Sequence, residues 1–121
     1  MCGAPAALSR ASGEVLAARC YRATSAMARL VGLLGTPDLA EDEALWLEPC
    51  ASVHTWGMRI PIACAFLDRD GQVLRVVDPL PPWRVAAPAR GQRARAAVEC
   101  RAGSLTGLPV GERLLRYAAQ A

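Results

Sequence analysis

Apolar residues along the chain fall mostly in short runs that are separated by glycine, proline and aspartate. Turn signals recur at intervals of roughly 8 to 12 residues, a spacing typical of sandwiches and barrels built from short strands. The runs that predict strands lie at residues 14–22, 44–47, 52–56, 62–67, 73–77, 95–100 and 113–117.

One segment has a different period. Met27, Leu30, Val31 and Leu34 are spaced as on one face of a helix, and Gly35 follows as a stop signal. The spacing predicts an amphipathic helix over residues 25–34.

The sequence therefore predicts a mainly β fold, a jelly-roll-like barrel or sandwich of short strands with one amphipathic helix. Residues 1–12 are mostly small, which predicts a flexible N-terminal arm, and residues 13–121 are expected to form a single domain. A chain of 121 residues is long enough for a core without metal or disulfide support.

The clearest turn is Asp70-Gly71, between the apolar run 62–67 and the run 73–77. An Asp-Gly pair supplies the positive φ angles that a tight β-hairpin requires. We expect this pair at the hairpin tip, with Asp68 and Asp70 serving local backbone hydrogen bonds rather than catalysis.

Charge and hydropathy exclude several classes of protein. The formal net charge is +3, and it comes from 14 arginines and no lysine, with acidic residues interspersed. Nucleic-acid binding is not indicated, because it calls for a clustered basic face. No apolar run approaches the roughly 18 residues of a membrane span. We expect a soluble, cytoplasmic protein, although the sequence is also compatible with a removed export leader, and it leaves the oligomeric state unknown.

Five cysteines are scattered along the chain without a Cys-x-x-Cys pair, and there is a single histidine. Scattered cysteines are typical of reduced, mostly buried thiols, and one histidine is a poor start for a zinc site. We therefore predict no bound metal and no cofactor. Cys50 and Cys64 precede and follow the histidine and are the weaker candidates for a thiolate nucleophile.

The candidate site is the segment that contains this histidine. His54, Thr55 and Arg59 could line one end of the fold, where an arginine fork and a titratable imidazole would bind an anion. Trp83 follows a proline run and is the aromatic residue expected to be exposed. His54 and Arg59 share a face only if a bulge at Gly57 adds one residue to the strand. The alternative is that His54 is a structural residue.

Three stretches also resemble a known family. RLVGLLG at 29–35, CASVHTWGMRIPIACAFLDRDGQVLRVV at 50–77, and VECRAG with GLPVGERL near the C-terminus resemble domain of unknown function family 192, small bacterial and archaeal proteins. The resemblance covers roughly residues 14–117. It implies a mainly β, jelly-roll-like barrel and brings no established activity. Members usually carry Asp where this chain has Ala63 and where it has Glu112, so a family site built on the first carboxylate would be lost or changed here.

Three functional hypotheses follow. The first is a binding module for a small molecule, glycan or peptide at a polar site near His54 and Arg59. The second is an enzyme with His54 as general base, which requires a carboxylate or nucleophile within hydrogen-bond reach. The third is an accessory protein that acts through a surface around Trp83.

Overall fold

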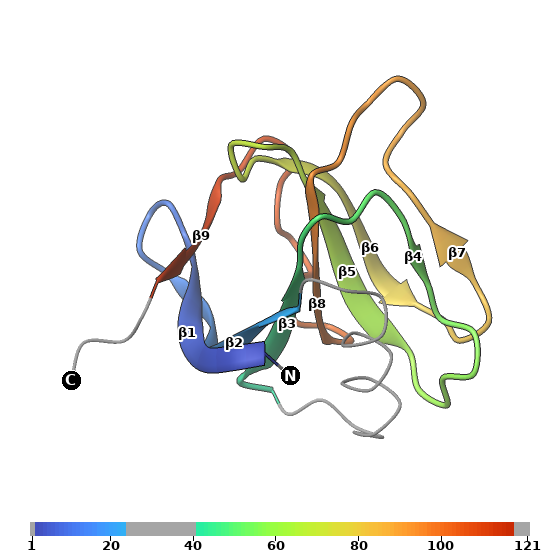
Figure 1. Ribbon diagram of the computed structural model, residues 1–121, viewed down its shortest axis with the longest axis horizontal. Coiled ribbons are helices and arrows are strands. Elements are labelled where there is room, and N and C mark those ends of the chain that lie inside the picture. The colour runs from blue at the N-terminus through green and yellow to red at the C-terminus, as the bar shows by residue number, and fades with distance from the viewer. Residues whose placement is uncertain (1, 24–40, 118–121) are drawn as a thin grey trace.

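The computed structural model describes residues 2–23 and 41–117, which form strands, turns and loops (Figure 1). The helix expected at 25–34 lies outside the described residues. Within the described residues no helix is long and apolar enough to cross a membrane. The strands are β1 (Cys2–Arg10), β2 (Val15–Ala23), β3 (Glu43–Leu47), β4 (Val53–His54), β5 (Ile62–Leu67), β6 (Val73–Leu80), β7 (Val85–Ala86), β8 (Ala96–Arg101) and β9 (Leu114–Tyr117).

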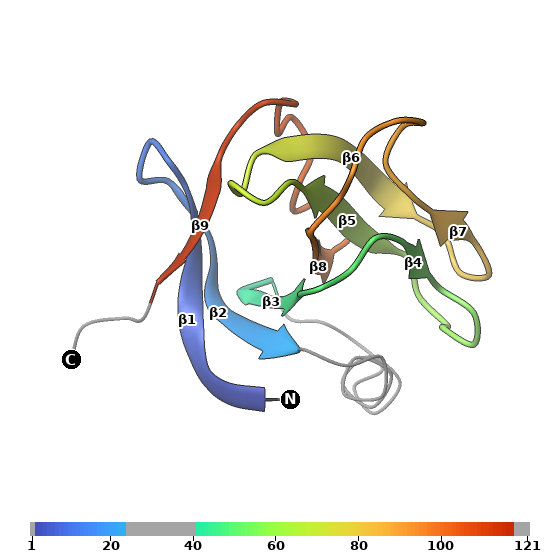
Figure 2. The same ribbon diagram turned by 45° about the horizontal axis from the view of Figure 1, so that its top comes forward.

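Seven strands form one sheet in the order β6-β5-β8-β3-β2-β1-β9, and β4 and β7 form a second, two-stranded sheet. Neighbouring strands are antiparallel except β2 and β3, which are parallel. Figures 1 and 2 show β4 and β7 at one side of the molecule, close to β5 and β6, with β1 and β9 at the opposite side. The prediction of a mainly β fold is therefore confirmed.

The large sheet curves but does not close. Its edge strands β6 and β9 approach each other only at their ends, where Gln72 and Arg113 form an isolated bridge. Hydrogen bonds from the Val73 amide to the Glu112 carbonyl (2.7 Å) and from the Leu114 amide to the Gly71 carbonyl (2.9 Å) support this contact. The expected jelly-roll-like barrel is not supported, because seven strands leave the two edges unpaired along most of their length.

Core residues lie on both faces of the large sheet, as the continuous apolar run of β5 requires. Ala63, Ala65 and Leu67 belong to a cluster that also contains Leu8 of β1 and Leu114 of β9. Because these strands belong to opposite parts of the sheet, this cluster fills the inside of the curve.

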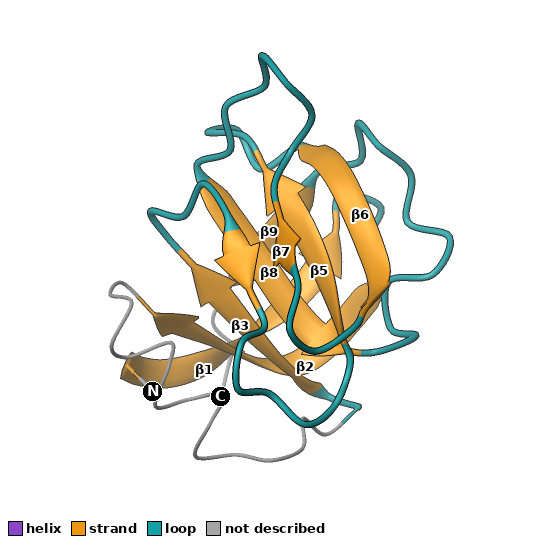
Figure 3. Cartoon of the chain, turned by 90° about the vertical axis from the view of Figure 1, so that its right-hand side faces the viewer, coloured by secondary structure: helices purple, strands orange, loops and turns teal. Residues whose placement is uncertain are grey.

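The other residues of β5 face a second cluster on the outer side of the sheet. Ile62 and Phe66 pack there with Val53 of β4, Ala86 of β7 and the buried Met58. Figure 3, seen from this side, shows β4 and β7 in front of the strands of the large sheet. The small sheet therefore covers the outer core with one face and leaves the other face exposed.

The expected hairpin is confirmed. Strands β5 and β6 pair antiparallel, with Leu67 opposite Val73. At the tip, the Asp68 carboxylate accepts hydrogen bonds from the amides of Asp70 (2.8 Å) and Gln72 (3.0 Å). Gly71 has a φ of 82°. Asp68 thus has the local role that the sequence indicates.

The expectation of a flexible arm at the N-terminus is wrong for residues 2–10. They form β1, which pairs with β2 on one side and with β9 on the other. Ala6, Leu8 and Ser9 are buried. Small residues such as alanine suggested weak packing, but they suit a strand that is enclosed between two neighbours.

Candidate functional site

Thr55 organises the segment around the histidine. Its side chain is fully buried, and its hydroxyl donates to the Pro81 carbonyl (2.7 Å) and accepts from the Arg84 amide (2.9 Å). Its own amide donates to the Arg84 carbonyl (2.8 Å), and its carbonyl accepts from the Trp83 amide (3.0 Å). Thr55 therefore fixes the chain at 81–84 against β4 and keeps its hydroxyl inside the protein.

Trp83 is held in an unusual conformation by these bonds. Its φ is 62°, the left-handed region that bulky residues rarely adopt, and its side chain is 65% exposed. The hydrogen bond from the Trp83 amide to Thr55 fixes this backbone. The result is an indole presented to solvent.

His54 lies next to further exposed side chains. It is opposite Val85 in the β4–β7 register, and both are exposed, whereas the neighbouring pair, Val53 and Ala86, is buried. The His54 ring contacts the Trp56 ring, with centroids 5.3 Å apart and planes tilted by 38°. Trp56 is 55% exposed and Val85 61%.

These residues form one surface, which we call the β4–β7 aromatic surface and define as His54, Trp56, Trp83 and Val85. Trp83 belongs to it because its amide bonds to Thr55, between His54 and Trp56. The structure thus brings two of the predicted site residues, His54 and Trp83, to the same small sheet.

Arg59 lies in the bend after this segment, where it is exposed. Gly57, with a φ of 82°, belongs to a turn in which the Met58 amide donates to the Thr55 carbonyl (3.1 Å). This turn takes the place of the bulge expected at Gly57, because β4 ends at His54. Arg59 thus follows the Gly57 turn and Arg84 follows Trp83, and both are exposed.

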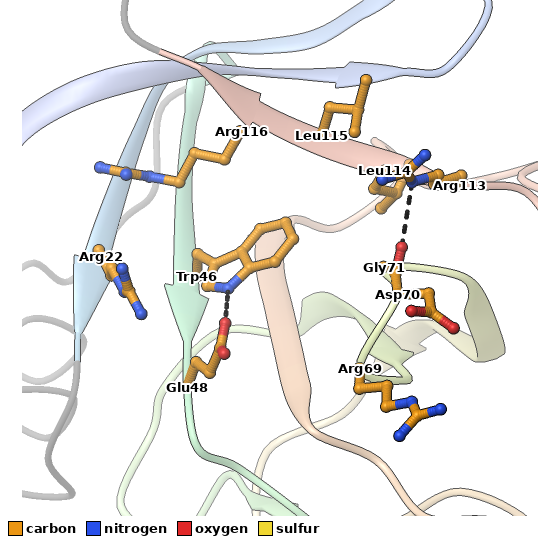
Figure 4. Close-up of a pocket in the computed structure, with 10 residues that line it drawn as sticks. All are labelled: Arg22, Trp46, Glu48, Arg69, Asp70, Gly71, Arg113, Leu114, Leu115 and Arg116. Carbon is orange, nitrogen blue, oxygen red and sulfur yellow. Dashed lines mark hydrogen bonds between the residues drawn. The ribbon is translucent and has the colours of Figure 1, made fainter.

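A second candidate lies on the inner side of the large sheet, at its partly open end (Figure 4). It is a cavity of about 270 Å³ between β2, β3, the β5–β6 turn and β9. Its lining contains four arginines, two carboxylates and one indole; the residues are Arg22, Trp46, Glu48, Arg69, Asp70, Gly71, Arg113, Leu114, Leu115 and Arg116. We call it the arginine cavity.

Trp46 and Glu48 form the floor of the arginine cavity. The indole N–H donates to the Glu48 carboxylate (2.9 Å), and Arg95 donates to its other oxygen (3.3 Å). The hydrogen bond from Trp46 is the largest cause that holds the pKa of Glu48 below its usual range, with further contributions from Arg95 and Arg22. Glu48 is therefore an ionised, already partnered group.

The sequence did not single out this cavity. Trp46, in the strand predicted at 44–47, is half-buried and packs against the inner cluster at the cavity. The available signal was the spacing of Trp46 and Glu48, two residues apart on a strand and therefore on one face. The arginines came from strands whose pairing the sequence does not reveal.

Burial is the main feature of the cysteines whose side chains the structure describes. Cys20, Cys64 and Cys100 are buried, and Cys50 is half-buried. Burial raises the pKa of Cys20 to about 11 and raises the pKa of Cys100 further, with smaller contributions from Cys20 and the buried Glu99. Across residues 2–23 and 41–117, no group of three or more His, Cys, Asp and Glu side chains gathers in a metal-like arrangement.

Comparison with known proteins identifies the family. The model of family DUF192, described as "Uncharacterized ACR", matches residues 7–115. The chain belongs to this family. A search of curated proteins gives no match. The DUF192 fold is also found in two crystal structures of low sequence identity.

One is a protein of Sinorhizobium meliloti 1021, described as a "putative transcription regulator"; it is 17% identical, with a TM-score of 0.76 over 96% of this chain and 97% of that one. The other is a protein of unknown function of Novosphingobium aromaticivorans DSM 12444; it is 19% identical, with a TM-score of 0.73 over 92% of this chain and 83% of that one. At these identities the likeness concerns the fold.

The two departures from the DUF192 pattern have different environments. Ala63 is fully buried in the inner core and pairs with Cys100 of β8. Glu112 forms a two-point ion pair with Arg10, with both N···O distances at 3.2 Å. The alanine thus completes an apolar core here, and the glutamate joins β1 to the chain just before β9.

Proposed function

We propose that this protein is a binding module that contacts its ligand through the β4–β7 aromatic surface, and that the ligand is an acidic glycan. The observation that carries the proposal is the exposure of two of the three tryptophans, Trp56 and Trp83, in the turns that flank the small β4–β7 sheet. Arg59 and Arg84 flank them and are exposed.

The exposure of these two indoles is energetically unfavourable, because large aromatic side chains are normally buried. Each large aromatic side chain offers 150–250 Å² for burial, and about 25 cal/mol is gained per Å² of apolar surface removed from water. Trp83 also occupies a strained φ that costs on the order of 1–3 kcal/mol. Strained residues of this kind cluster at ligand-binding sites, which supports a binding role for the surface.

The chemistry of the surface favours a glycan with acidic groups. Two exposed rings offer flat platforms for the apolar faces of sugar rings, because an indole is apolar on its face and polar only at its N–H. The flanking arginines offer forked donors that suit carboxylates. Sugar hydroxyls and carboxylates would complement both features.

The test is to titrate the full chain with an oligomer of galacturonic acid and to measure binding by isothermal titration calorimetry. Trp83→Ala should weaken binding about tenfold or more, since truncating a tryptophan that anchors a binding interface costs about 2 kcal/mol or more. Val110→Ala is the matched control, because Val110 is an equally exposed apolar residue on another loop (66%). A neutral oligomer of glucose should bind more weakly than the acidic one.

Two results would contradict the proposal. The first is absence of binding to both oligomers. The second is equal weakening by Trp83→Ala and Val110→Ala. The contact of the His54 ring with the Trp56 indole fits a place for His54 in the aromatic surface.

A further inference from the structure

The arginine cavity has a polar half and an apolar half. Figure 4 shows the Trp46 indole in the middle, with the guanidinium of Arg22 and the side chain of Arg116 on the side of β2, and Leu114 on the side of β9. Trp46 is half-buried, so the accessible part of its indole contributes apolar wall, and Leu114 lies buried behind the β9 side. A ligand in the cavity would thus meet cations at one end and carbon at the other.

Beside the Trp46 indole, the positive charges of Arg22 and Arg116 exceed the single negative charge of Glu48. Glu48 is hydrogen-bonded to Trp46 and to Arg95, and its charge also interacts with Arg22, which helps to keep the Glu48 pKa low. Figure 4 shows the side chains of Arg69 and Asp70 directed away from the indole. The positive field beside Trp46 therefore comes from Arg22 and Arg116.

Arg22 and Arg116 differ in how they are held. The Nε of Arg116 donates to the Cys20 carbonyl (3.0 Å), which orients its guanidinium across the cavity. Among the described residues no hydrogen bond or ion pair engages the exposed Arg22 guanidinium, so its fork of donors faces solvent. A guanidinium with an open fork binds a carboxylate through two parallel hydrogen bonds.

We propose that the arginine cavity binds a small aromatic carboxylate, with the carboxylate on Arg22 and the ring against Trp46. The volume of about 270 Å³ lies just below the range of about 300–1,000 Å³ that is typical of sites for drug-sized ligands, which favours a single ring. This site is separate from the β4–β7 aromatic surface, so each can fail without the other.

The test uses benzoate as the probe and the full chain labelled with ¹⁵N. The Trp46 indole N–H, identified by its loss in Trp46→Phe, reports on the cavity directly. Benzoate should shift this resonance in a saturable way and should bind more tightly than acetate or benzamide, which carry only one half of the recognised chemistry. Arg22→Ala should weaken benzoate binding about tenfold or more. Arg22→Lys should weaken it too, because lysine keeps the charge but lacks the fork.

Two control variants distinguish specific binding in the arginine cavity from nonspecific attraction of anions to the positively charged protein. Arg90→Ala removes the same charge from the exposed loop between β7 and β8 and should leave benzoate binding unchanged. Glu48→Gln removes the competing negative charge, while its amide oxygen can still accept from Trp46, so it should strengthen binding. Trp83→Ala should have no effect, which distinguishes this result from the glycan test.

The proposal is overturned if benzoate does not move the Trp46 resonance at saturating concentrations. It is also overturned if acetate binds as tightly as benzoate, or if Arg90→Ala weakens binding as much as Arg22→Ala. Weaker binding in Glu48→Gln would equally contradict it. The melting temperature of each variant shows whether a loss reflects the site or the fold.

Discussion

Gly71 at the hairpin tip meets two constraints at the scale of a single residue. Its φ of 82° disfavours any side chain, and a Cβ there would lie 2.8 Å from the Leu114 carbonyl oxygen. Gly91 has a similar φ of 86° but nothing within 4 Å of its Cβ position. We predict that Gly71→Ala lowers the free energy of unfolding by about 1–3 kcal/mol.

Gly91→Ala is the control for this prediction, because it adds the same methyl group at a similar φ without the clash. Urea denaturation of both variants measures the difference. If the two substitutions cost the same, the contact between the β5–β6 turn and β9 is looser than the structure indicates.

Glu48 predicts a dependence of stability on pH. Its pKa in the folded protein lies below the ordinary value of 4.5, chiefly because Trp46 donates to it. The stabilisation is therefore fully present above about pH 4.5 and is lost as the pH falls through the lower folded pKa. Glu48→Gln should be less stable than the wild type near neutral pH, and the gap between their melting temperatures should narrow below pH 4.5.

The control for this pH dependence is Glu41→Gln, which removes an exposed carboxyl. It should leave the wild-type curve almost unchanged, since exposed charges contribute little. A gap between wild type and Glu48→Gln that stays constant down to pH 3 would contradict the role given to the Trp46 hydrogen bond.

The candidate site was partly visible in the sequence at this scale. Val53, His54, Thr55 and Trp56 alternate between buried and exposed, so the pattern could have grouped Trp56 with His54. The role of Thr55 could not be seen, because its partners Pro81 and Arg84 are distant in the sequence. Arg22 could not be recognised as a site residue either, because the other residues that line its cavity are distant in the sequence.

Strand β1 shows at the scale of elements how a sequence pattern can mislead. Its small residues resemble a flexible arm, yet it pairs on both sides and buries Leu8 completely. We predict that Leu8→Ala lowers the free energy of unfolding by about 2–5 kcal/mol, the usual cost of a leucine truncated in a core. A flexible arm would tolerate this change.

Leu115→Ala is the matched control, because Leu115 lies opposite Ser9 in the same strand pairing but is 37% exposed. Its effect on the midpoint of urea denaturation should be much smaller. If Leu8→Ala and Leu115→Ala lower the free energy of unfolding equally, the enclosure of β1 between β2 and β9 is not what stabilises this part of the sheet.

Other elements were predictable to different degrees. The bounds of β5 matched its apolar run, and β2, β3, β8 and β9 lie within a residue or two of the expected positions. Strand β7 was not expected, since two residues carry no pattern of their own. The parallel pairing of β2 and β3 was likewise hidden, because hydrophobic alternation does not encode strand direction.

The open form of the large sheet matters at the scale of the whole molecule. Short strands and frequent turns predicted a barrel, but closure depends on strand number, tilt and stagger, none of which can be read from local patterns. The partial contact between the β5–β6 turn and β9 leaves the arginine cavity at the inner face, whereas the aromatic surface lies on the small sheet outside. The two proposed sites therefore belong to different parts of the architecture.

This division also predicts where the molecule opens first. Strands β5 and β8 are each paired on both sides and almost wholly buried, whereas β4 and β7 share only two residue pairs. Amide exchange in such a fold is expected to need global unfolding at the centre and only local opening at the small sheet. The amides of Thr55 and Trp83 should thus exchange at a lower free energy than those of Cys64 and Ala65.

Hydrogen exchange followed by NMR at low denaturant measures these free energies one amide at a time. A ligand that stacks on Trp83 should raise the protection of the Thr55 and Trp83 amides and that of β5 by a similar free energy, because it binds neither the open form of the small sheet nor the unfolded chain. Benzoate in the arginine cavity should leave this local difference in place. If Thr55 and Cys64 exchange at the same free energy without ligand, the small sheet opens only when the whole chain unfolds, and its separate behaviour is contradicted.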